Sequence, residues 1–81
     1  DNDNMGTIST TAEKFATRVK FERIKRKYWQ EKLAELAGIG RSTLTQIEAQ
    51  TSSPTLDVVE KIAMALGFET YEMLIFKNLE I

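Results

Sequence analysis

The stretch that decides the fold runs from residue 30 to residue 48 and reads Gln30-Glu31-Lys32-Leu33-Ala34-Glu35-Leu36-Ala37-Gly38-Ile39-Gly40-Arg41-Ser42-Thr43-Leu44-Thr45-Gln46-Ile47-Glu48. Leu33, Ala34 and Ala37 have the i, i+1, i+4 spacing of one helix face, which predicts a helix over the first eight of these residues. Gly38 stands where a helix commonly ends with a left-handed residue. A second amphipathic helix is expected over residues 41–49. The stretch therefore predicts two short helices joined by a tight turn.

The regions before and after this pair carry clear helix signals. Thr10 and Glu13 have capping-box spacing ahead of a helix expected over residues 11–27. Thr55 is the expected N-cap of a further helix, which Gly67 ends. The apolar residues expected to face the core on these two helices are Phe15, Val19, Ile24, Leu56, Val59, Ile62, Ala63 and Leu66.

A fifth helix is expected over residues 70–78, and its apolar residues fall on two sides. Met73 and Leu74 share one side, at about 100° of rotation per residue. The residues of the other side are Tyr71, Ile75, Phe76 and Leu79. A short surface helix needs only one buried face, so the second face requires another partner. We expect a homodimer contact there; the alternative is that the chain end folds back and covers it.

These elements predict one compact all-α domain of five helices over residues 10–81, with the C-terminal helix used for dimerisation. Residues 1–9 are polar and without period, so we expect a flexible N-terminal arm. A chain of 81 residues lies near the lower size at which a single apolar core is stable without staples.

The residue types present exclude several classes of function. The sequence has no cysteine and no histidine, which excludes disulfides, thiolate metal sites and histidine-based catalysis. No segment has metal-ligand or phosphate-loop spacing. No apolar run approaches the roughly 20 residues of a membrane span, and no signal-peptide pattern opens the chain. We expect a cytoplasmic protein that is not an enzyme and needs no metal, cofactor or small-molecule ligand.

Positive charge is concentrated in one part of the chain. Residues 14–41 carry nine Lys and Arg against three Glu, a balance of +6, although the whole chain has a net charge of −1. Residues 42–81 have a balance of −4 and residues 1–13 a balance of −3. Association with a polyanion depends on where the positive charge lies. A solvated basic helix is the alternative that the charge alone favours.

The helix expected over residues 41–49 has one polar side. The residues of its outer arc, about 140° wide at 3.6 residues per turn, are Arg41, Ser42, Thr45, Gln46 and Ala49. Leu44 and Ile47 lie on the opposite side. Arg can bind guanine and Gln can bind adenine with two hydrogen bonds each, and Ser or Thr suits several base edges. An ordinary amphipathic helix has a similar pattern, so the arc alone is weak support for DNA binding.

Residues 18–74 resemble the helix-turn-helix domain of lambdoid phage repressors and their relatives, the XRE or Cro/C1-type regulators. The matching elements are Arg23, Gln30-Glu31-Lys32-Leu33-Ala34, Ala37-Gly38-Ile39, Leu44, Ile47-Glu48, Pro54-Thr55-Leu56 and Ala65-Leu66-Gly67. The resemblance implies a lambda-repressor-like fold in which the helices over 30–37 and 41–49 form the helix-turn-helix. Small members of this group include restriction–modification controller proteins, phage repressors and antitoxins.

The resemblance also implies roles for single residues. The residues expected to read bases are Arg41, Ser42, Thr45 and Gln46. Gln30 is expected to bind a backbone phosphate and to brace the first side chain of the recognition helix. Further phosphate contacts are expected from Lys32, Trp29, Thr51, Ser52 and Ser53. Arg23 and Glu48 are expected to form a buried ion pair between the first helix and the end of the third.

The chain departs from the family pattern at several positions. Trp29 replaces the usual Ser, Thr or Asn cap of the second helix, and Gly40 replaces the usual Ser or Thr before the third. Two capping hydroxyls are thus missing, each commonly worth about 1 kcal/mol. Gln50 stands where the pattern prefers Gly, and residues 51–53 lack the Lys and Arg that many relatives have there.

Together these features predict a sequence-specific DNA-binding transcriptional regulator of the small controller or repressor type. We expect a homodimer on a palindromic operator in double-stranded DNA, and a nucleoid-associated protein of prokaryotic or phage origin. Because the sequence ends soon after the fifth expected helix, no ligand-sensing domain is expected. One alternative is an antitoxin-type autorepressor of a toxin–antitoxin pair. Another is a protein-interaction module that has lost DNA binding, which the uncharged loop and the acidic second half favour.

Overall fold

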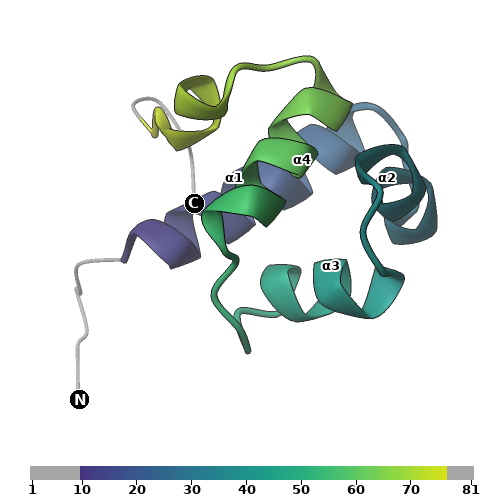
Figure 1. Ribbon diagram of the computed structural model, residues 1–81, viewed down its shortest axis with the longest axis horizontal. Coiled ribbons are helices and arrows are strands. Elements are labelled where there is room, and N and C mark those ends of the chain that lie inside the picture. Colours follow the sequence, from purple (N-terminus) through teal and green to yellow (C-terminus); the bar gives the residue numbers. More distant parts are fainter. Residues whose placement is uncertain (1–9, 77–81) are drawn as a thin grey trace.

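Four α-helices and one turn of 3-10 helix form residues 10–76, the part of the chain that the computed structural model describes. These elements are α1 (Thr11–Lys25), α2 (Gln30–Ala37), α3 (Arg41–Glu48), α4 (Leu56–Leu66) and the 3-10 helix η1 (Thr70–Leu74). The described residues contain no strand. Figure 1 shows α4 crossing in front of α1, with α2 and α3 at one end of the pair.

The helix starts and stops follow the local sequence signals. The Thr10 hydroxyl accepts from the Glu13 N–H at 3.1 Å, and the Glu13 carboxylate accepts from the Thr10 N–H at 2.8 Å, which confirms the capping box of α1. Thr55 caps α4 by accepting from the Val58 N–H at 3.2 Å. Gly67 ends α4 with φ +84°, a left-handed conformation that is unfavourable for any residue with a Cβ. These predicted boundaries are confirmed.

The core receives fully buried side chains from every element. The largest of them are Phe15, Val19, Leu33, Leu44, Ile47, Ile62 and Met73. Two expected core residues are wrong, because Ile24 and Leu56 are exposed. The buried stripe of α1 continues from Val19 through Glu22 and Arg23, which turns Ile24 to the outer side of the helix. Leu56 is the first residue of α4 and is exposed at the N-terminal end of the helix, whereas the buried residues lie in the following turns.

The prediction of a fifth α-helix over residues 70–78 is wrong. The 3-10 helix ends at Leu74, and Ile75 has extended backbone angles, φ −91° and ψ 111°. Arg18 Nη1 donates a hydrogen bond to the Ile75 carbonyl at 2.7 Å, and Phe76 packs back against the core. A polar contact to α1 and an apolar one to the core thus replace the next helical turn. The expected arm over residues 1–9 and the end of the expected fifth helix, Leu79 included, lie outside the described residues.

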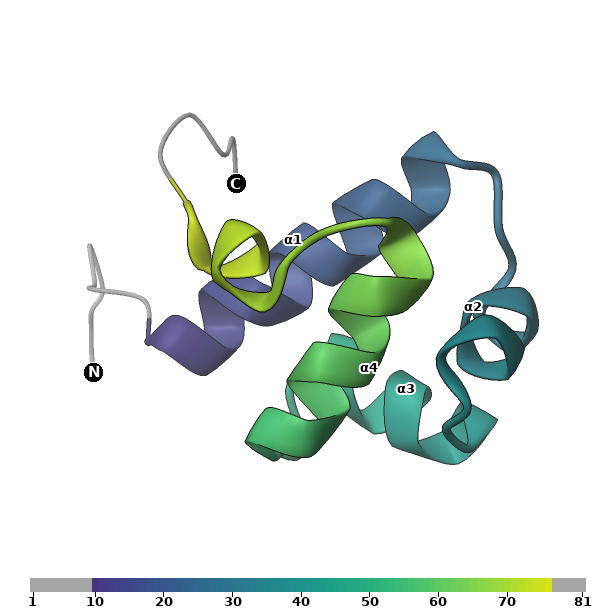
Figure 2. The same ribbon diagram turned by 45° about the horizontal axis from the view of Figure 1, so that its top comes forward.

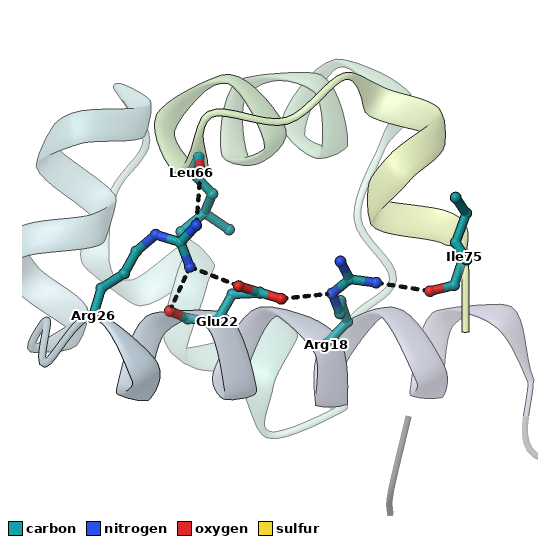
Figure 3. Close-up of polar contacts among 5 residues, drawn as sticks. All are labelled: Arg18, Glu22, Arg26, Leu66 and Ile75. Carbon is teal, nitrogen blue, oxygen red and sulfur yellow. Dashed lines mark hydrogen bonds and ion pairs between the residues drawn. The ribbon is translucent and has the colours of Figure 1, made fainter. Parts of the chain in front are cut away.

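Glu22 binds two arginines, Arg18 and Arg26, each of which also donates a hydrogen bond to a backbone carbonyl of another segment (Figure 3). The Glu22 carboxylate is 3.0 Å from Arg18 Nε and 2.6 Å from Arg26 Nη1. Arg18 binds the Ile75 carbonyl, and Arg26 Nη2 binds the Leu66 carbonyl at 3.0 Å. Burial by itself raises the pKa of Glu22, but hydrogen bonds from Arg26 and Arg18 outweigh it and lower that pKa below its usual value. The network joins α1 to the end of α4 and to the segment after η1.

Figures 1 and 2 place η1 beside the first half of α1 and on the opposite side of the molecule from α3. The fold therefore separates the polar face of α3 from the apolar side chains of η1.

No helix of the described residues is long and apolar enough to span a membrane.

Candidate nucleic-acid interface

The outer face of α3 is polar and exposed. Leu44 and Ile47 point inward and are buried in the core, which fixes the rotation of the helix about its axis. The residues on the solvent side are Arg41, Ser42, Thr45 and Gln46, all exposed. Ala49, the C-cap of α3, is also exposed. The packing of two buried residues thus orients four polar side chains outward.

The turn between α2 and α3 depends on one glycine. Gly38 has φ +72°, and its N–H donates to the Glu35 carbonyl at 3.2 Å, while the Ile39 N–H donates to the Ala34 carbonyl at 3.0 Å. The chain then turns into α3, whose N-cap is Gly40. Ala34 and Ala37 are buried, so α2 can lie close to its neighbours. The predicted helix-turn-helix geometry is present.

A buried ion pair fastens the end of α3 to α1. Arg23 Nε is 2.8 Å from Glu48 Oε2, and Arg23 Nη2 is 2.9 Å from Glu48 Oε1. Only 11% of the Arg23 side chain and 4% of the Glu48 side chain are exposed. Arg23 Nη1 also donates to the Tyr28 carbonyl at 2.9 Å. The structure therefore brings together the two charges that composition alone would place on the surface.

Gln30, the first residue of α2, joins this pair to the face of α3. Its Nε2 donates to Glu48 Oε1 at 3.2 Å, and its Oε1 accepts from the Thr45 hydroxyl at 2.9 Å. The resemblance implied that Gln30 braces the first side chain of α3; in the described residues its hydrogen-bond partner on α3 is Thr45. Thr45 lies one turn further along α3 and occupies the side nearest to the start of α2. A chain of contacts thus runs from Arg23 to an exposed hydroxyl.

The N-termini of α2 and α3 have no side-chain caps. Trp29 and Gly40 are the N-cap residues, and neither makes a capping hydrogen bond. The first N–H groups of both helices therefore lack intrahelical partners. Trp29 is 82% exposed, which leaves it without a packing role in the described chain. The side chains around the start of α2 line a surface hollow of about 320 Å³, formed by Arg23, Trp29, Gln30, Glu31 and Arg41.

A family comparison matches residues 19–73 to the helix-turn-helix family HTH_3, an interval that contains α2, the turn and α3. The chain belongs to this family. Its members are DNA-binding transcriptional regulators of the XRE or Cro/C1 type.

Two repressors and one controller protein illustrate the relationship. The chain is 34% identical over 59 residues to the CTXphi transcriptional repressor RstR of Vibrio cholerae, covering 73% of the chain and 53% of RstR. It is 42% identical over 52 residues to the immunity repressor of Bacillus phage phi105, covering 64% of the chain and 36% of that repressor. The chain thus spans about half or less of these two relatives.

The crystal structure of the restriction–modification controller protein C.AhdI from Aeromonas hydrophila has a TM-score of 0.72 to this chain. The two are 32% identical, with 76% of this chain and 94% of C.AhdI covered. The fold is therefore all-helical and lambda-repressor-like, with four α-helices in the described residues in place of the five expected.

The loop after α3 in this helix-turn-helix protein exposes hydroxyls instead of cations. Thr51, Ser52 and Ser53 are exposed, and the Thr51 hydroxyl donates to the Gln46 carbonyl at 3.3 Å. Gln50 has φ +64° in the left-handed region, a conformation that Gly adopts without strain. Any positive charge near the loop must come from other elements.

Part of the basic charge in the helix-turn-helix domain is used internally. Arg18, Arg23 and Arg26 all form ion pairs with buried carboxylates. The cations that stay exposed are Lys20, Lys25, Lys27, Lys32, Arg41 and Lys61, the last of them paired with Asp57. Sequence reasoning missed the role of Arg18 and Arg26, although their i, i+4 spacing to Glu22 was a usable signal. It also missed the bond from Thr45 to Gln30, for which the sequence has no local signal.

Three of the four residues expected at a dimer interface are described, and these three do not share one helix face. Tyr71 and Ile75 are exposed, in agreement with a surface role. Phe76 packs against the core, and the Lys14 ammonium lies 5.8 Å from the centre of its ring. Leu79 lies outside the described residues. The early end of η1 causes the difference, since Phe76 follows an extended residue and turns inward.

Proposed function

We propose that this protein is a sequence-specific DNA-binding transcriptional regulator of the small controller or repressor type. The observation that carries the proposal is the outward polar face of α3, held in place by Leu44 and Ile47 and by the ion pair of Arg23 with Glu48. A helix of this size fits the major groove of B-DNA, where each base pair presents a distinct pattern of donors and acceptors. Similarity to phage repressors and to a controller protein supports the same function.

The proposed base contacts use the four outer side chains of α3. Arg41 lies at the N-terminal end of the helix and can bind O6 and N7 of guanine through its guanidinium fork. Gln46 can bind N6 and N7 of adenine with its amide. Ser42 and Thr45, which lie between Arg41 and Gln46 in α3, present hydroxyl groups. Recognition by α3 would therefore combine two long bidentate side chains with two short adaptable ones.

The proposed phosphate contacts surround the start of α2. Uncapped helix N-termini bind anions because their free N–H groups and the helix dipole favour negative charge. Gln30 keeps one amide hydrogen beyond its bond to Glu48. Trp29 is exposed beside it and Lys32 is exposed one turn later. Together with the hydroxyls of residues 51–53, these groups can bind phosphates of the DNA backbone on both sides of α3.

The proposed assembly is a homodimer through the segment that follows α4. Tyr71, Leu74 and Ile75 are all exposed there. Exposed apolar side chains that adjoin one another commonly mark protein contacts. A symmetric dimer would place two α3 helices in successive major grooves, about 34 Å apart on one face of a palindromic site.

Selection from randomised duplexes, followed by fluorescence anisotropy on the selected sequence, tests the DNA-binding proposal. Arg41→Ala is expected to weaken binding by about 1–3 kcal/mol and to relax the preference at one base pair per half-site. Lys32→Ala is the matched control: it should weaken binding equally on all sequences and reduce the salt slope by about 1. A wild-type protein that binds no sequence better than bulk DNA at low salt refutes the proposal and favours an interaction module.

Sedimentation at micromolar concentration tests the dimer. Ile75→Asp is expected to convert a dimer to a monomer of 9.2 kDa, because it places a charge in the apolar contact. Leu36→Asp is the control, since Leu36 is 46% exposed against 49% for Ile75 but lies on α2. A monomeric wild-type protein contradicts the dimer while leaving DNA binding to be judged by the first assay.

A further inference from the structure

The hydrogen-bond chain behind α3 has a defined direction. Arg23 donates through Nε and Nη2 to both oxygens of the Glu48 carboxylate, and a guanidinium has no acceptor. The carboxylate has no hydrogen to give, so the group next to it must also donate. That group is the Gln30 amide, whose Nε2 lies 3.2 Å from Glu48 Oε1. The buried charges therefore fix which end of the Gln30 amide faces Glu48.

The same direction is passed on to Thr45. With Nε2 turned to Glu48, the Gln30 amide presents its oxygen to α3, and Thr45 Oγ1 lies 2.9 Å from it. A carbonyl oxygen only accepts, so the single hydroxyl hydrogen of Thr45 is committed to Gln30. The lone pairs of the hydroxyl are left for a ligand on the exposed side of α3. Thr45 is thus presented to the groove as an acceptor.

We infer that Thr45 selects a base with an amino group in the major groove, which means adenine or cytosine. Adenine presents N6–H₂ and cytosine N4–H₂ there, whereas guanine presents only acceptors, and thymine an acceptor and a methyl group. Guanine or thymine could bind the hydroxyl only if Thr45 broke its bond to Gln30 and left that oxygen without its partner. Gln30 acts here as a positioning residue, and Glu48 sets its orientation. This inference rests on the proposed function and specifies the base class that one residue reads.

Binding constants measured on duplexes with each of the four bases at every operator position test the inference. The position read by Thr45 is the one where Thr45→Val changes the ratios between bases. At that position the wild type is expected to prefer adenine or cytosine, and Thr45→Val should reduce the preference by about fivefold, the effect of one neutral hydrogen bond. Thr45→Ser keeps the hydroxyl and should keep the preference. Thermal unfolding verifies that each variant is folded.

A second variant tests the direction of the chain. Gln30→Leu removes the acceptor and frees the Thr45 hydroxyl to donate. Duplexes with guanine or thymine at that position should then bind as tightly as those with adenine or cytosine. The ratio between bases is the readout, because loss of a phosphate contact weakens binding on every sequence.

Three results would overturn the inference: guanine or thymine preferred at the Thr45 position, equal weakening of all four bases by Thr45→Val, or no effect of that variant at any position. A wild type without preference at any position contradicts the proposed function itself.

Discussion

Replacing Arg23 by methionine tests how much the buried ion pair of Arg23 with Glu48 stabilises the fold. The substitution keeps a flexible, unbranched stem, although a shorter one, and removes the charge. It deletes two hydrogen bonds to Glu48 and one to the Tyr28 carbonyl. The Glu48 side chain, only 4% exposed, would then keep a single donor, the Gln30 amide. A nearly unpaired carboxylate would remain buried between α1 and α3.

The expected loss is large compared with the stability of such a domain. Breaking a buried pair by removing one partner destabilises a protein by about 3–5 kcal/mol, because the remaining charge lacks compensation. A folded chain of 81 residues has a total stability of about 4–12 kcal/mol. Arg23→Met should therefore remove a quarter or more of the free energy of unfolding. If the total lies near the lower end of this range, the variant should be unfolded at room temperature.

Urea unfolding followed by far-ultraviolet circular dichroism measures this loss, provided that the slope m is unchanged. The double variant Arg23→Met with Glu48→Met should be about 2 kcal/mol more stable than Arg23→Met alone, because no charge is left buried. Lys61→Met is the matched control. Its partner Asp57 is 3.3 Å away in a pair whose side chains are 46% and 70% exposed, so a loss below about 1 kcal/mol is expected. If Arg23→Met costs no more than Lys61→Met, the buried pair does not stabilise the fold as argued.

Three further changes should alter stability in defined directions. Gln50→Gly should stabilise the protein by about 0.5–1 kcal/mol in urea unfolding, since φ +64° is strained for a residue with a Cβ. Gly38→Ala should destabilise it by about 1 kcal/mol although a Cβ there meets open space, because φ is +72°; an unchanged midpoint would show that this strain is relieved. The pKa of Glu22 is lowered in the folded state, so its contribution is present above the usual carboxyl pKa and is lost as the pH falls through the lowered value. Glu22→Gln should flatten this acid limb of the stability curve, and an identical limb in both proteins would assign the acid sensitivity to other carboxylates.

Local patterns in the sequence predicted most of the helical framework. The capping box of α1, the Thr55 cap and the left-handed Gly38 all depend on residues within a few positions of one another, and each is present. The outward arc of α3 was predictable for the same reason, because a period of about 3.6 residues orders its side chains around the helix. Such features need no knowledge of the rest of the fold.

Features that depend on distant contacts were not predictable from periodicity. The end of η1 is set by Arg18 and the core, which capture Ile75 and Phe76 from a remote part of the chain. The helical pattern of residues 70–78 could not reveal this competition. Arg23 illustrates the opposite case, because only family resemblance, and not composition, indicated that this charge is buried. The bond between Gln30 and Thr45 joins the N-terminus of one helix to the middle of the next, so neither helix pattern contains it.

The side chains of α3 divide into two kinds according to their attachment to the scaffold. Thr45 is hydrogen-bonded to Gln30, which is hydrogen-bonded to Glu48. A substitution at Glu48 should therefore change both the free energy of unfolding and the base preference that we infer for Thr45. In the described residues, the side chains of Arg41 and Gln46 make no hydrogen bond to the rest of the domain. Their replacement should alter base preference with little effect on folding. In the proposed mode of DNA binding, substitutions at Arg41 and Gln46 should therefore change base preference at the smallest cost in stability. A change at the position proposed for Thr45 should also disturb the buried pair of Arg23 and Glu48.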